Sequence, residues 1–562
     1  MKNIKLAVLA LLSSLVVSGL VLPDADAETD INLTEKARIV DALLEDLNTP
    51  GSPGAAVAVV YDGSLVYSNG FGLANLEYNI PNTPQTIYHV ASVSKQFTVY
   101  AVLLLEQMGK LSIDDDIRIF IPELPDFGDV ITLRHLASHT SGLRDQWNLL
   151  GMAGWRLDDV ITKEHILTYT SRQKELNFPP GEQYLYSNTG FTLLGEVVAR
   201  VSGMTFNEFA IQQIFKPLGM TNTFFYDDHE RIVSNRAYSY YSNEDLFKKS
   251  ILSYANAGAT SLFTTAVDLG RWAIFMNRPY ADKVPVVELM NRQAKLTSGE
   301  TIRGALGQFV DNYRGLHRIQ HGGADAGYRT FMARFPEQNF AVIVLGNYAQ
   351  FNPAMYASLI TAVYLEDLLE SDEPLPLFSF VENPGIDIDF LKKFEGLYVN
   401  QINATSRNIS VKNNDLTFSS GGHHANLIHV SDSLFWFPGT EITILFKDQY
   451  GKMTASVNTP QEPIHYIREN PVSYSKEDLE TFTGNYFSEE LQTTYSIELN
   501  EGNLVARHLR TGDISLVPAS ENHFRGDRWY MQGVRFIKEN GEVTGFRASS
   551  SRVWNVWFER IQ

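Results

Sequence analysis

The stretch from Ser92 to Met108 carries the first chemical signal in this chain. It is apolar on every side of a helical wheel, and Gly109 follows it as a stop signal. Lys95 is the only charge between Ser92 and Glu106. Residues at i and i+3 lie on one helix face, so Ser92 and Lys95 are neighbours. A serine beside a desolvated lysine is an activated nucleophile with its base.

The Ser-x-x-Lys pattern recurs at Ser171–Lys174 and at Ser473–Lys476. Both of these copies lie among polar and charged residues, where a lysine is solvated and keeps its proton. The apolar surroundings therefore select Ser92 and Lys95 as the catalytic pair.

A second candidate group is Tyr186-Ser187-Asn188, which follows a rigid Pro-Pro-Gly turn and opens an apolar helix. Tyr186 is a candidate proton shuttle, because a phenol beside a cationic lysine is expected to have a lowered pKa. Asn188 can hydrogen-bond both Lys95 and a substrate amide.

The third candidate group is His321-Gly322-Gly323 on a predicted strand. Glycines on a strand let a substrate backbone approach closely, and Gly323 is placed for this role. The backbone N–H groups of Ser92 and Ala324 are predicted to form an oxyanion hole.

The order of these three groups resembles that of the serine β-lactamase and penicillin-binding-protein superfamily. The His-x-Gly form of the third group is similar to the branch that contains D-aminopeptidases, class C β-lactamase-like peptidases and esterases. The resemblance covers about residues 34–370. It implies an α+β fold with a five-stranded antiparallel sheet flanked by helices and a separate all-α region. D-aminopeptidases of that branch also carry two C-terminal β-barrels.

One departure from the superfamily pattern bears on the substrate. The third group is commonly Lys-Thr-Gly, and His321 stands here in place of that lysine. The exchange removes a fixed positive charge for a substrate carboxylate. It argues against strong β-lactam hydrolysis and D,D-carboxypeptidase activity.

The elements that must position these groups follow from local patterns. A helix starting at Thr34, a hairpin through Asp62-Gly63 and three adjacent antiparallel strands between Leu316 and Leu345 are predicted. The segment 131–143 predicts a helix and then a turn at Gly142, with core or capping roles for its two histidines, His135 and His139.

The region beyond about residue 386 contains an internal repeat. Residues 391–398 match residues 479–486 at an offset of 88, and both copies show alternating strands. This pattern predicts two small antiparallel barrels, or one barrel built from two halves.

The predicted domain boundaries are 1–27 for a signal peptide, 28–372 for the hydrolase domain, 373–385 for a linker, and 386–472 and 473–562 for the barrel repeats. The first segment has a basic start, an apolar middle and an Ala-x-Ala cleavage site. The sequence therefore predicts export to a bacterial periplasm or exterior, with no membrane span after cleavage.

A loop in the last repeat, from Ser520 to Arg528, is predicted to gate the active site. It carries Asp527 after a glycine, and an acidic side chain delivered there would bind a free substrate amine. A solvated hairpin loop is the alternative interpretation.

Composition restricts the partners of this 562-residue chain. Its net charge is −19, which argues against nucleic acid or an anionic membrane as a partner. It has no cysteine and no His-Glu-x-x-His. No cofactor or metal is predicted, because the chain has no His-Glu-x-x-His and its histidine cluster lacks a clear fourth ligand. The oligomeric state is left open.

The function that these patterns favour is a secreted serine hydrolase acting on a D-amino-acid amide, a short peptide or an ester. A carboxylesterase or a weak β-lactamase of the same fold is one alternative. A penicillin-binding sensor without turnover is another, and a zinc hydrolase using His423, His424 and His429 is a third.

Overall fold

The computed structural model describes residues 25–243, 246–278, 285–370, 386–420, 423–438, 440, 442–449, 451–459, 463–470 and 472–561. Most of the predicted signal peptide (1–24) and the predicted linker (373–385) lie outside the described residues. Helix α2 spans Ala25–Leu44. The prediction that a helix starts at Thr34 is wrong, because the Ala- and Glu-containing segment before it continues the same helix.

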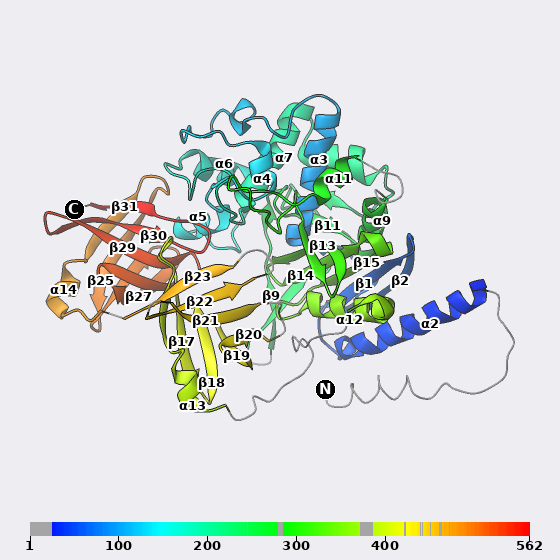
Figure 1. Cartoon of the computed structure of the whole chain (residues 1–562). Coiled ribbons are helices and arrows are strands. Elements are labelled where there is room, and N and C mark those ends of the chain that lie inside the picture. The colour runs from blue at the N-terminus through cyan, green and yellow to red at the C-terminus, as the bar shows by residue number, and fades with distance from the viewer. Residues whose placement is uncertain are drawn as a thin grey trace. The chain divides into compact units, whose positions relative to one another are not determined.

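The N-terminal region folds around a six-stranded antiparallel sheet in the order β12-β13-β14-β15-β1-β2 (Figure 1). The strands are β1 (Ala55–Tyr61), β2 (Ser64–Phe71), β12 (Phe309–Tyr313), β13 (Leu316–Asp325), β14 (Tyr328–Phe335) and β15 (Phe340–Gly346). The predicted hairpin and the three adjacent strands are confirmed. The implied count of five is wrong, because β12 folds back on β13 as an additional edge strand.

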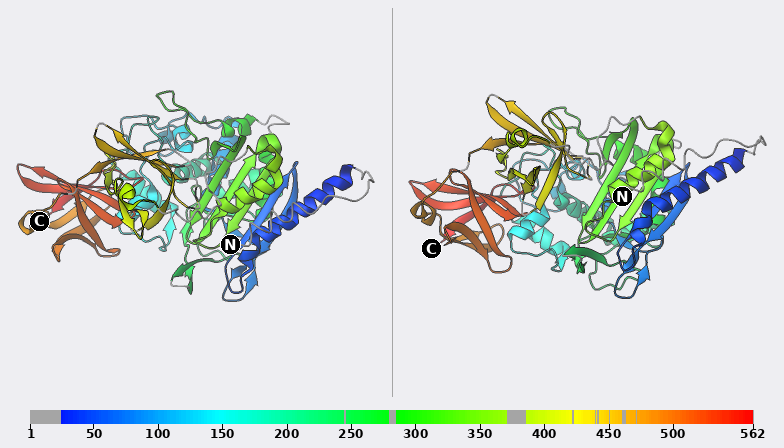
Figure 2. Two further views of the ribbon diagram at one scale, coloured as in Figure 1. Left: turned by 60° about the horizontal axis from the view of Figure 1, so that its bottom comes forward. Right: turned by 90° about the horizontal axis from the view of Figure 1, so that it is seen from below.

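The two faces of this sheet are covered by different helices. Ala341 and Ile343 of β15 belong to the main core, together with Trp272 of α9 (Ala266–Asn277). The alternate residue Phe340 meets Tyr364 of α12 (Pro353–Leu365), with ring centres 5.8 Å apart. Figure 2 shows α12 along the sheet. Coverage on both faces explains why β15 is buried throughout its length.

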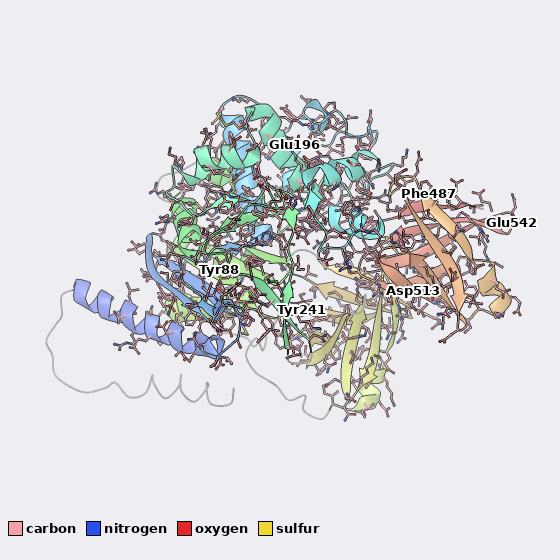
Figure 3. The ribbon with its side chains drawn as sticks, turned by 180° about the vertical axis from the view of Figure 1, so that it is seen from behind. Tyr88, Glu196, Tyr241, Phe487, Asp513 and Glu542 are labelled. Atoms are coloured by element: carbon pink, nitrogen blue, oxygen red, sulfur yellow. The ribbon has the colours of Figure 1, made fainter. Side chains whose placement is uncertain are left out.

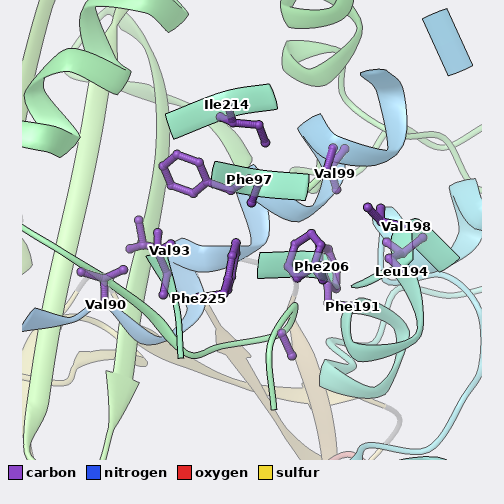
Figure 4. Packing of buried hydrophobic residues seen from close by; sticks show 14 of the residues in the cluster. Val90, Val93, Phe97, Val99, Phe191, Leu194, Val198, Phe206, Ile214 and Phe225 are labelled. Atoms are coloured by element: carbon purple, nitrogen blue, oxygen red, sulfur yellow. The ribbon is translucent and has the colours of Figure 1, made fainter. Parts of the chain in front are cut away.

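The helix that carries the candidate nucleophile lies in the middle of the main core. A 3-10 turn, η2 (Ala91–Ser94), leads directly into α3 (Lys95–Gln107). Phe97 of α3 stacks near Trp272 at 4.3 Å and near Phe215 at 5.6 Å. Figure 4 shows Phe97 among other buried residues of this core, which include Val93 and Ile214. A rigid core therefore holds α3 in place.

The other helices of this region are α4 (Leu133–Ala137), α5 (Gln146–Met152), α6 (Lys163–Ser171), α7 (Asn188–Ser202), α8 (Phe206–Ala210) and α11 (Pro285–Asn291). Short helical turns are η1 (Glu45–Asn48), η3 (Ile117–Ile119), η4 (Ile211–Phe215), η5 (Pro336–Gln338) and η6 (Glu366–Leu368). Short strands are β3 (Leu73–Asn75), β4 (Ile80–Pro81), β5 (Tyr88–His89), β6 (Ile161–Thr162), β7 (Phe224–Phe225), β8 (Ser239–Asn243), β9 (Leu246–Ser250), β10 (Tyr254–Ala255) and β11 (Leu262–Thr264).

The C-terminal region forms two closed eight-stranded barrels, which settles the choice that the repeat left open. Barrel 1 contains α13 (Ile388–Lys392) and β16 (Gly396–Val399), β17 (Ser406–Lys412), β18 (Asp415–Ser420), β19 (His423–Ser431), β20 (Leu434–Trp436), β21 (Thr443–Gln449), β22 (Lys452–Asn458) and β23 (Ile464–Glu469). Barrel 2 contains α14 (Lys476–Glu480) and β24 (Gly484–Ser488), β25 (Thr493–Asn500), β26 (Asn503–His508), β27 (Gly512–Ser520), β28 (His523–Arg528), β29 (Met531–Glu539), β30 (Glu542–Ser549) and β31 (Val556–Ile561).

The sequence repeat has a structural counterpart in the two barrels. Tyr398 donates to the carbonyl of Phe394 at 2.9 Å, and Tyr486 donates to that of Phe482 at 2.7 Å. Both tyrosines are buried and lie 88 positions apart. Figure 3 labels Phe487, Asp513 and Glu542 in barrel 2.

Barrel 2 shares its core with the hydrolase region. Leu149 and Met152 of α5 belong to the hydrophobic cluster that fills this barrel. Arg144 donates to Glu490 at 2.7 Å, and both side chains are almost fully buried. These contacts show that α5 packs against the core of barrel 2.

None of the described helices is long and apolar enough to cross a membrane.

Candidate active site

The predicted nucleophile and base are in contact. Ser92 is the second residue of η2 and is partly exposed, whereas Lys95 opens α3 and is fully buried. The Lys95 Nζ donates to Ser92 Oγ at 3.2 Å. Ala91, just before the serine, has φ = +47°, an unusual backbone for a residue with a side chain. This turn presents the hydroxyl while its neighbours stay in the core.

Two further acceptors fix the amine of Lys95. Nζ donates to Asn188 Oδ1 at 2.8 Å and to the carbonyl of Ala259 at 2.6 Å. Burial lowers the pKa of Lys95 to about 7, although the carboxylates of Asp325 and Asp145 oppose the shift. A large fraction of the amine is therefore neutral near pH 7, which a general base requires.

Tyr186 lies between the base and a buried histidine. Its ring centre is 4.9 Å from Lys95 Nζ, and His139 stacks on it at 4.1 Å. Burial raises the pKa of the Tyr186 phenol, and a hydrogen bond with Ser92 opposes the rise. The prediction that the pKa of Tyr186 is lowered is wrong, because the effect of desolvation outweighs the effect of nearby positive charge. A phenol that keeps its proton can donate it, so these pKa shifts are consistent with Tyr186 as the proton donor and Lys95 as the base, and both roles stay predictions.

The two histidines of the 131–143 segment have structural roles. His135 forms a capping box with Thr132 at the start of α4, as predicted. His139 Nδ1 accepts from the backbone N–H of Ser187 at 3.1 Å. His139 thus holds Tyr186 in two ways: its ring stacks on the tyrosine ring, and it accepts a hydrogen bond from the backbone of the next residue.

Asp145 is a site residue that the sequence analysis missed. One of its carboxylate oxygens accepts from Asn188 twice, from the backbone N at 2.7 Å and from Nδ2 at 2.8 Å. The other accepts from Trp147 N at 3.0 Å and caps α5. This arrangement directs the Asn188 carbonyl toward Lys95. In the sequence, Asp145 is recognisable only as an acidic N-cap before a helix, and an N-cap does not by itself indicate a catalytic role.

His321 forms part of the site wall as an uncharged ring. Its Nδ1 donates to the carbonyl of Gly322 at 2.6 Å, and its ring faces Tyr186 and Phe309, with centres 6.3 and 5.1 Å away. Burial lowers the pKa of His321 to about 3. The imidazole is therefore neutral at physiological pH.

Gly323 lies where β13 packs against η2, the turn that carries Ser92. A Cβ on this residue would lie 2.3 Å from the carbonyl oxygen of Val90 and 2.4 Å from Thr330 Oγ1. Only glycine permits this approach of the strand to the residues that precede Ser92.

Ala324 is exposed on the same strand. The pairing of β12 with β13 ends at Phe309 and Gln320, so no described strand of the sheet pairs with that edge beyond Gln320. An unpaired strand edge of this kind can take up an extended substrate backbone. The oxyanion hole of Ser92 and Ala324 N–H groups remains a prediction.

The two other Ser-x-x-Lys copies have solvated lysines. Lys174 is 58% exposed and lies 3.6 Å from Glu489, and Lys476 is 70% exposed and lies 3.7 Å from Glu480. Both amines are thus exposed to solvent beside a carboxylate, whereas Lys95 is fully buried. The selection of Ser92 and Lys95 by their apolar surroundings agrees with this contrast.

The predicted gating loop is not a loop. Residues His523–Arg528 form strand β28, and only residues 521–522 separate it from β27. Asp527 is half-exposed, and its ion pair is with the adjacent Arg528 at 3.9 Å. A different segment of barrel 2, between β30 and β31, approaches the site, and the guanidinium of Arg552 lies 4.7 Å from the ring centre of Tyr186. No local motif marked Arg552.

Within the described residues, no group of three or more His, Asp or Glu side chains is arranged to hold a metal ion.

The lowered pKa of Lys95 predicts the pH dependence of the reaction. Because the neutral amine is the active form, kcat/KM is expected to rise with pH through about pH 7 and level off about two units higher. Initial rates with a neutral ester between pH 5 and 10 measure this profile. A flat profile would contradict Lys95 as the base.

Comparison with known proteins connects this geometry to one family. The Beta-lactamase family profile matches residues 38–361, more than half of the chain. Protein flp of Staphylococcus aureus (strain MRSA252) is 26% identical over 336 residues, which cover 58% of this chain and 66% of flp. The chain thus spans just under two thirds of that relative's length.

Two further proteins are similar over a longer part of this chain. Penicillin-binding protein 4* of Bacillus subtilis (strain 168) is 26% identical over 434 residues, which are 73% of this chain and 94% of that protein. The octameric penicillin-binding protein homologue from Pyrococcus abyssi has a TM-score of 0.53 at 23% identity, covering 79% of this chain and 100% of its own. This structural likeness concerns the fold.

Proposed function

Because the chain belongs to the β-lactamase family, we propose that it is a serine hydrolase that forms an acyl-enzyme on Ser92 and acts on D-amino-acid amides, short peptides or esters. One observation carries the proposal. The amine of Lys95 is buried, has a pKa of about 7 and hydrogen-bonds Ser92 Oγ at 3.2 Å.

Each step of the proposed acyl transfer moves one proton between the site residues and the substrate. Lys95 takes the hydroxyl proton as Ser92 Oγ attacks the substrate carbonyl carbon, and the N–H groups of Ser92 and Ala324 stabilise the resulting oxyanion. Tyr186 then protonates the leaving group and regains a proton from the Lys95 ammonium. Lys95, neutral again, then takes a proton from a water molecule whose oxygen attacks the carbonyl carbon of the acyl-enzyme ester. The bond between this carbon and Ser92 Oγ breaks, the acid product leaves, and the Lys95 ammonium returns the proton to Ser92 Oγ.

The substrate class rests on the third group. His321-Gly322-Gly323 is similar to the branch with D-aminopeptidases and esterases, so D-amino-acid amides and esters are the first substrates to test. A carboxylesterase or a weak β-lactamase would use the same acyl-enzyme. The two closed barrels favour a sensor without turnover as the second candidate, since such barrels commonly bind ligands.

Covalent trapping tests the proposal. A fluorophosphonate probe is expected to add one adduct to the peptide that contains Ser92, with heat-denatured protein as the control. The same preparation is assayed with D- and L-aminoacyl nitroanilides, nitrophenyl esters and a chromogenic cephalosporin. Labelling with turnover of a D-aminoacyl substrate or an ester supports the hydrolase. Labelling without any turnover supports the sensor, and no labelling contradicts both.

We also propose that the protein is exported. The proposal rests on the basic start, apolar middle and Ala-x-Ala site within residues 1–27. N-terminal sequencing of protein from the periplasm or medium is expected to find a chain that begins at Glu28. Recovery of the uncleaved chain in the cytoplasm would contradict it.

A further inference from the structure

A loop of barrel 2 is anchored to the wall of the active site. It spans residues 550–555, between β30 and β31. The carbonyl oxygen of Arg552 accepts from Asp145 N at 3.3 Å and from Asn177 Nδ2 at 3.0 Å. The next contact is Trp554 N, which donates to Asn177 Oδ1 at 2.8 Å. The backbone of Arg552 is thus fixed beside Asp145, which itself positions the catalytic asparagine.

The side chain of Arg552 points to the candidate proton donor. Its guanidinium carbon lies 4.7 Å from the centre of the Tyr186 ring, and the residue is partly exposed. None of the described residues forms a hydrogen bond or an ion pair with this guanidinium. By contrast, Arg507 of the same barrel is paired with Glu498 at 3.1 Å. Arg552 therefore keeps its planar fork of donors available for a ligand.

The other basic groups of the site cannot offer such donors to a substrate. The Nζ of Lys95 is occupied by Ser92, Asn188 and Ala259. His321 is uncharged, because burial holds its pKa at about 3. The fixed positive charge that the third group lacks is thus present on a residue from the far end of the chain.

We infer that Arg552 binds a carboxylate on the leaving-group side of the substrate. The inference rests on the proposed function, in which Tyr186 protonates the leaving group. The guanidinium lies 4.7 Å from the ring centre of Tyr186, which places it near the group that Tyr186 protonates. A guanidinium binds a carboxylate through two parallel charge-assisted hydrogen bonds. The site thus selects an anionic leaving group, the opposite of the free amine that an acidic gating residue would select.

A pair of thioesters tests this selectivity. Both are acyl-D-alanyl thioesters, one with mercaptoacetate and the other with mercaptoacetamide as the leaving group. Thiol release is read without background, because the chain contains no cysteine. The native enzyme is expected to prefer the mercaptoacetate ester by about 10- to 100-fold in kcat/KM, the range of a hydrogen-bonded charge pair.

Substitutions assign the preference to one side chain. Arg552→Ala is expected to remove it, and Arg552→Lys to restore part of it as a point charge. The loop should stay in place, because the hydrogen bond from Asn177 goes to the backbone carbonyl of Arg552 and not to its side chain. Arg507→Ala, in the same barrel, is the control and should keep the full ratio. An equal loss on both thioesters with a shifted pH profile would overturn the inference, since Arg552 would then act through Tyr186.

A binding measurement needs no turnover. Calorimetry with Ser92→Ala protein compares N-acetyl-D-alanylglycine with its carboxamide. We expect about tenfold tighter binding of the carboxylate, lost in Ser92→Ala/Arg552→Ala. Equal affinities, or no binding of the carboxylate, overturn the inference even if the native enzyme hydrolyses other esters. A native enzyme that no probe labels at Ser92 overturns the proposed function instead.

Discussion

Replacing Ser92 by alanine is expected to lower kcat/KM by about 10³- to 10⁶-fold and to abolish covalent labelling. The size follows from other serine hydrolases, in which loss of the nucleophile leaves only binding and oxyanion stabilisation. Lys95→Ala should cost a similar factor, and the double variant little more, because the two residues act as one unit. Steady-state rates and intact-protein mass after probe treatment measure both effects.

Two serines in the same sequence pattern provide the controls. Ser171→Ala and Ser473→Ala remove hydroxyls that precede exposed lysines, so they should leave kcat/KM unchanged. The circular dichroism spectrum and melting temperature of Ser92→Ala should match those of the native protein. Loss of activity in either control with retention in Ser92→Ala would show that the nucleophile was wrongly assigned.

Glu490→Ala is expected to destabilise the protein by about 3–5 kcal/mol, because it removes the buried carboxylate that balances the charge of the Arg144 guanidinium. The remaining buried hydrogen-bond partners of this guanidinium, Gln173 and the carbonyl of Trp554, are uncharged. Arg144 is 1% exposed and Glu490 is 6% exposed, and they are 2.7 Å apart. Asp145 follows Arg144 directly, so kcat/KM should fall as well. Urea unfolding measures this loss of stability. The midpoint to compare is that of the unfolding transition in which activity is also lost.

A neighbouring carboxylate is the matched control. Glu175 lies 3.6 Å from Arg144 but is 50% exposed, so Glu175→Ala should cost at most about 1 kcal/mol. Removing both buried charges in Arg144→Met/Glu490→Leu should recover much of the loss. Equal effects of the two glutamate substitutions would contradict the view that the buried pair secures barrel 2 to the hydrolase region.

The sequence determined those features that depend on residues close together in the chain. Ser92 and Lys95 are three positions apart, so a helical turn alone brings them into contact. Apolar surroundings distinguished this pair from its two copies. Alternating strands, a two-residue turn and the 88-residue repeat likewise predicted the central strands and the barrel repeats. The strands and the turn follow from local periodicity, and the two barrels follow from the similarity of two segments of the same sequence.

The tertiary structure decided what depends on contacts between distant segments. Asp145 reaches Asn188 across 43 positions, and Arg552 reaches Tyr186 from another domain. The direction of the Tyr186 pKa shift depended on how completely the fold buries the phenol. The segment around Asp527 is strand β28, paired with β27 and β29, and not the loop that the sequence analysis predicted. Burial and long-range contacts determine the desolvation and the charge at the site. The spacing of residues along the sequence predicts neither burial nor such contacts.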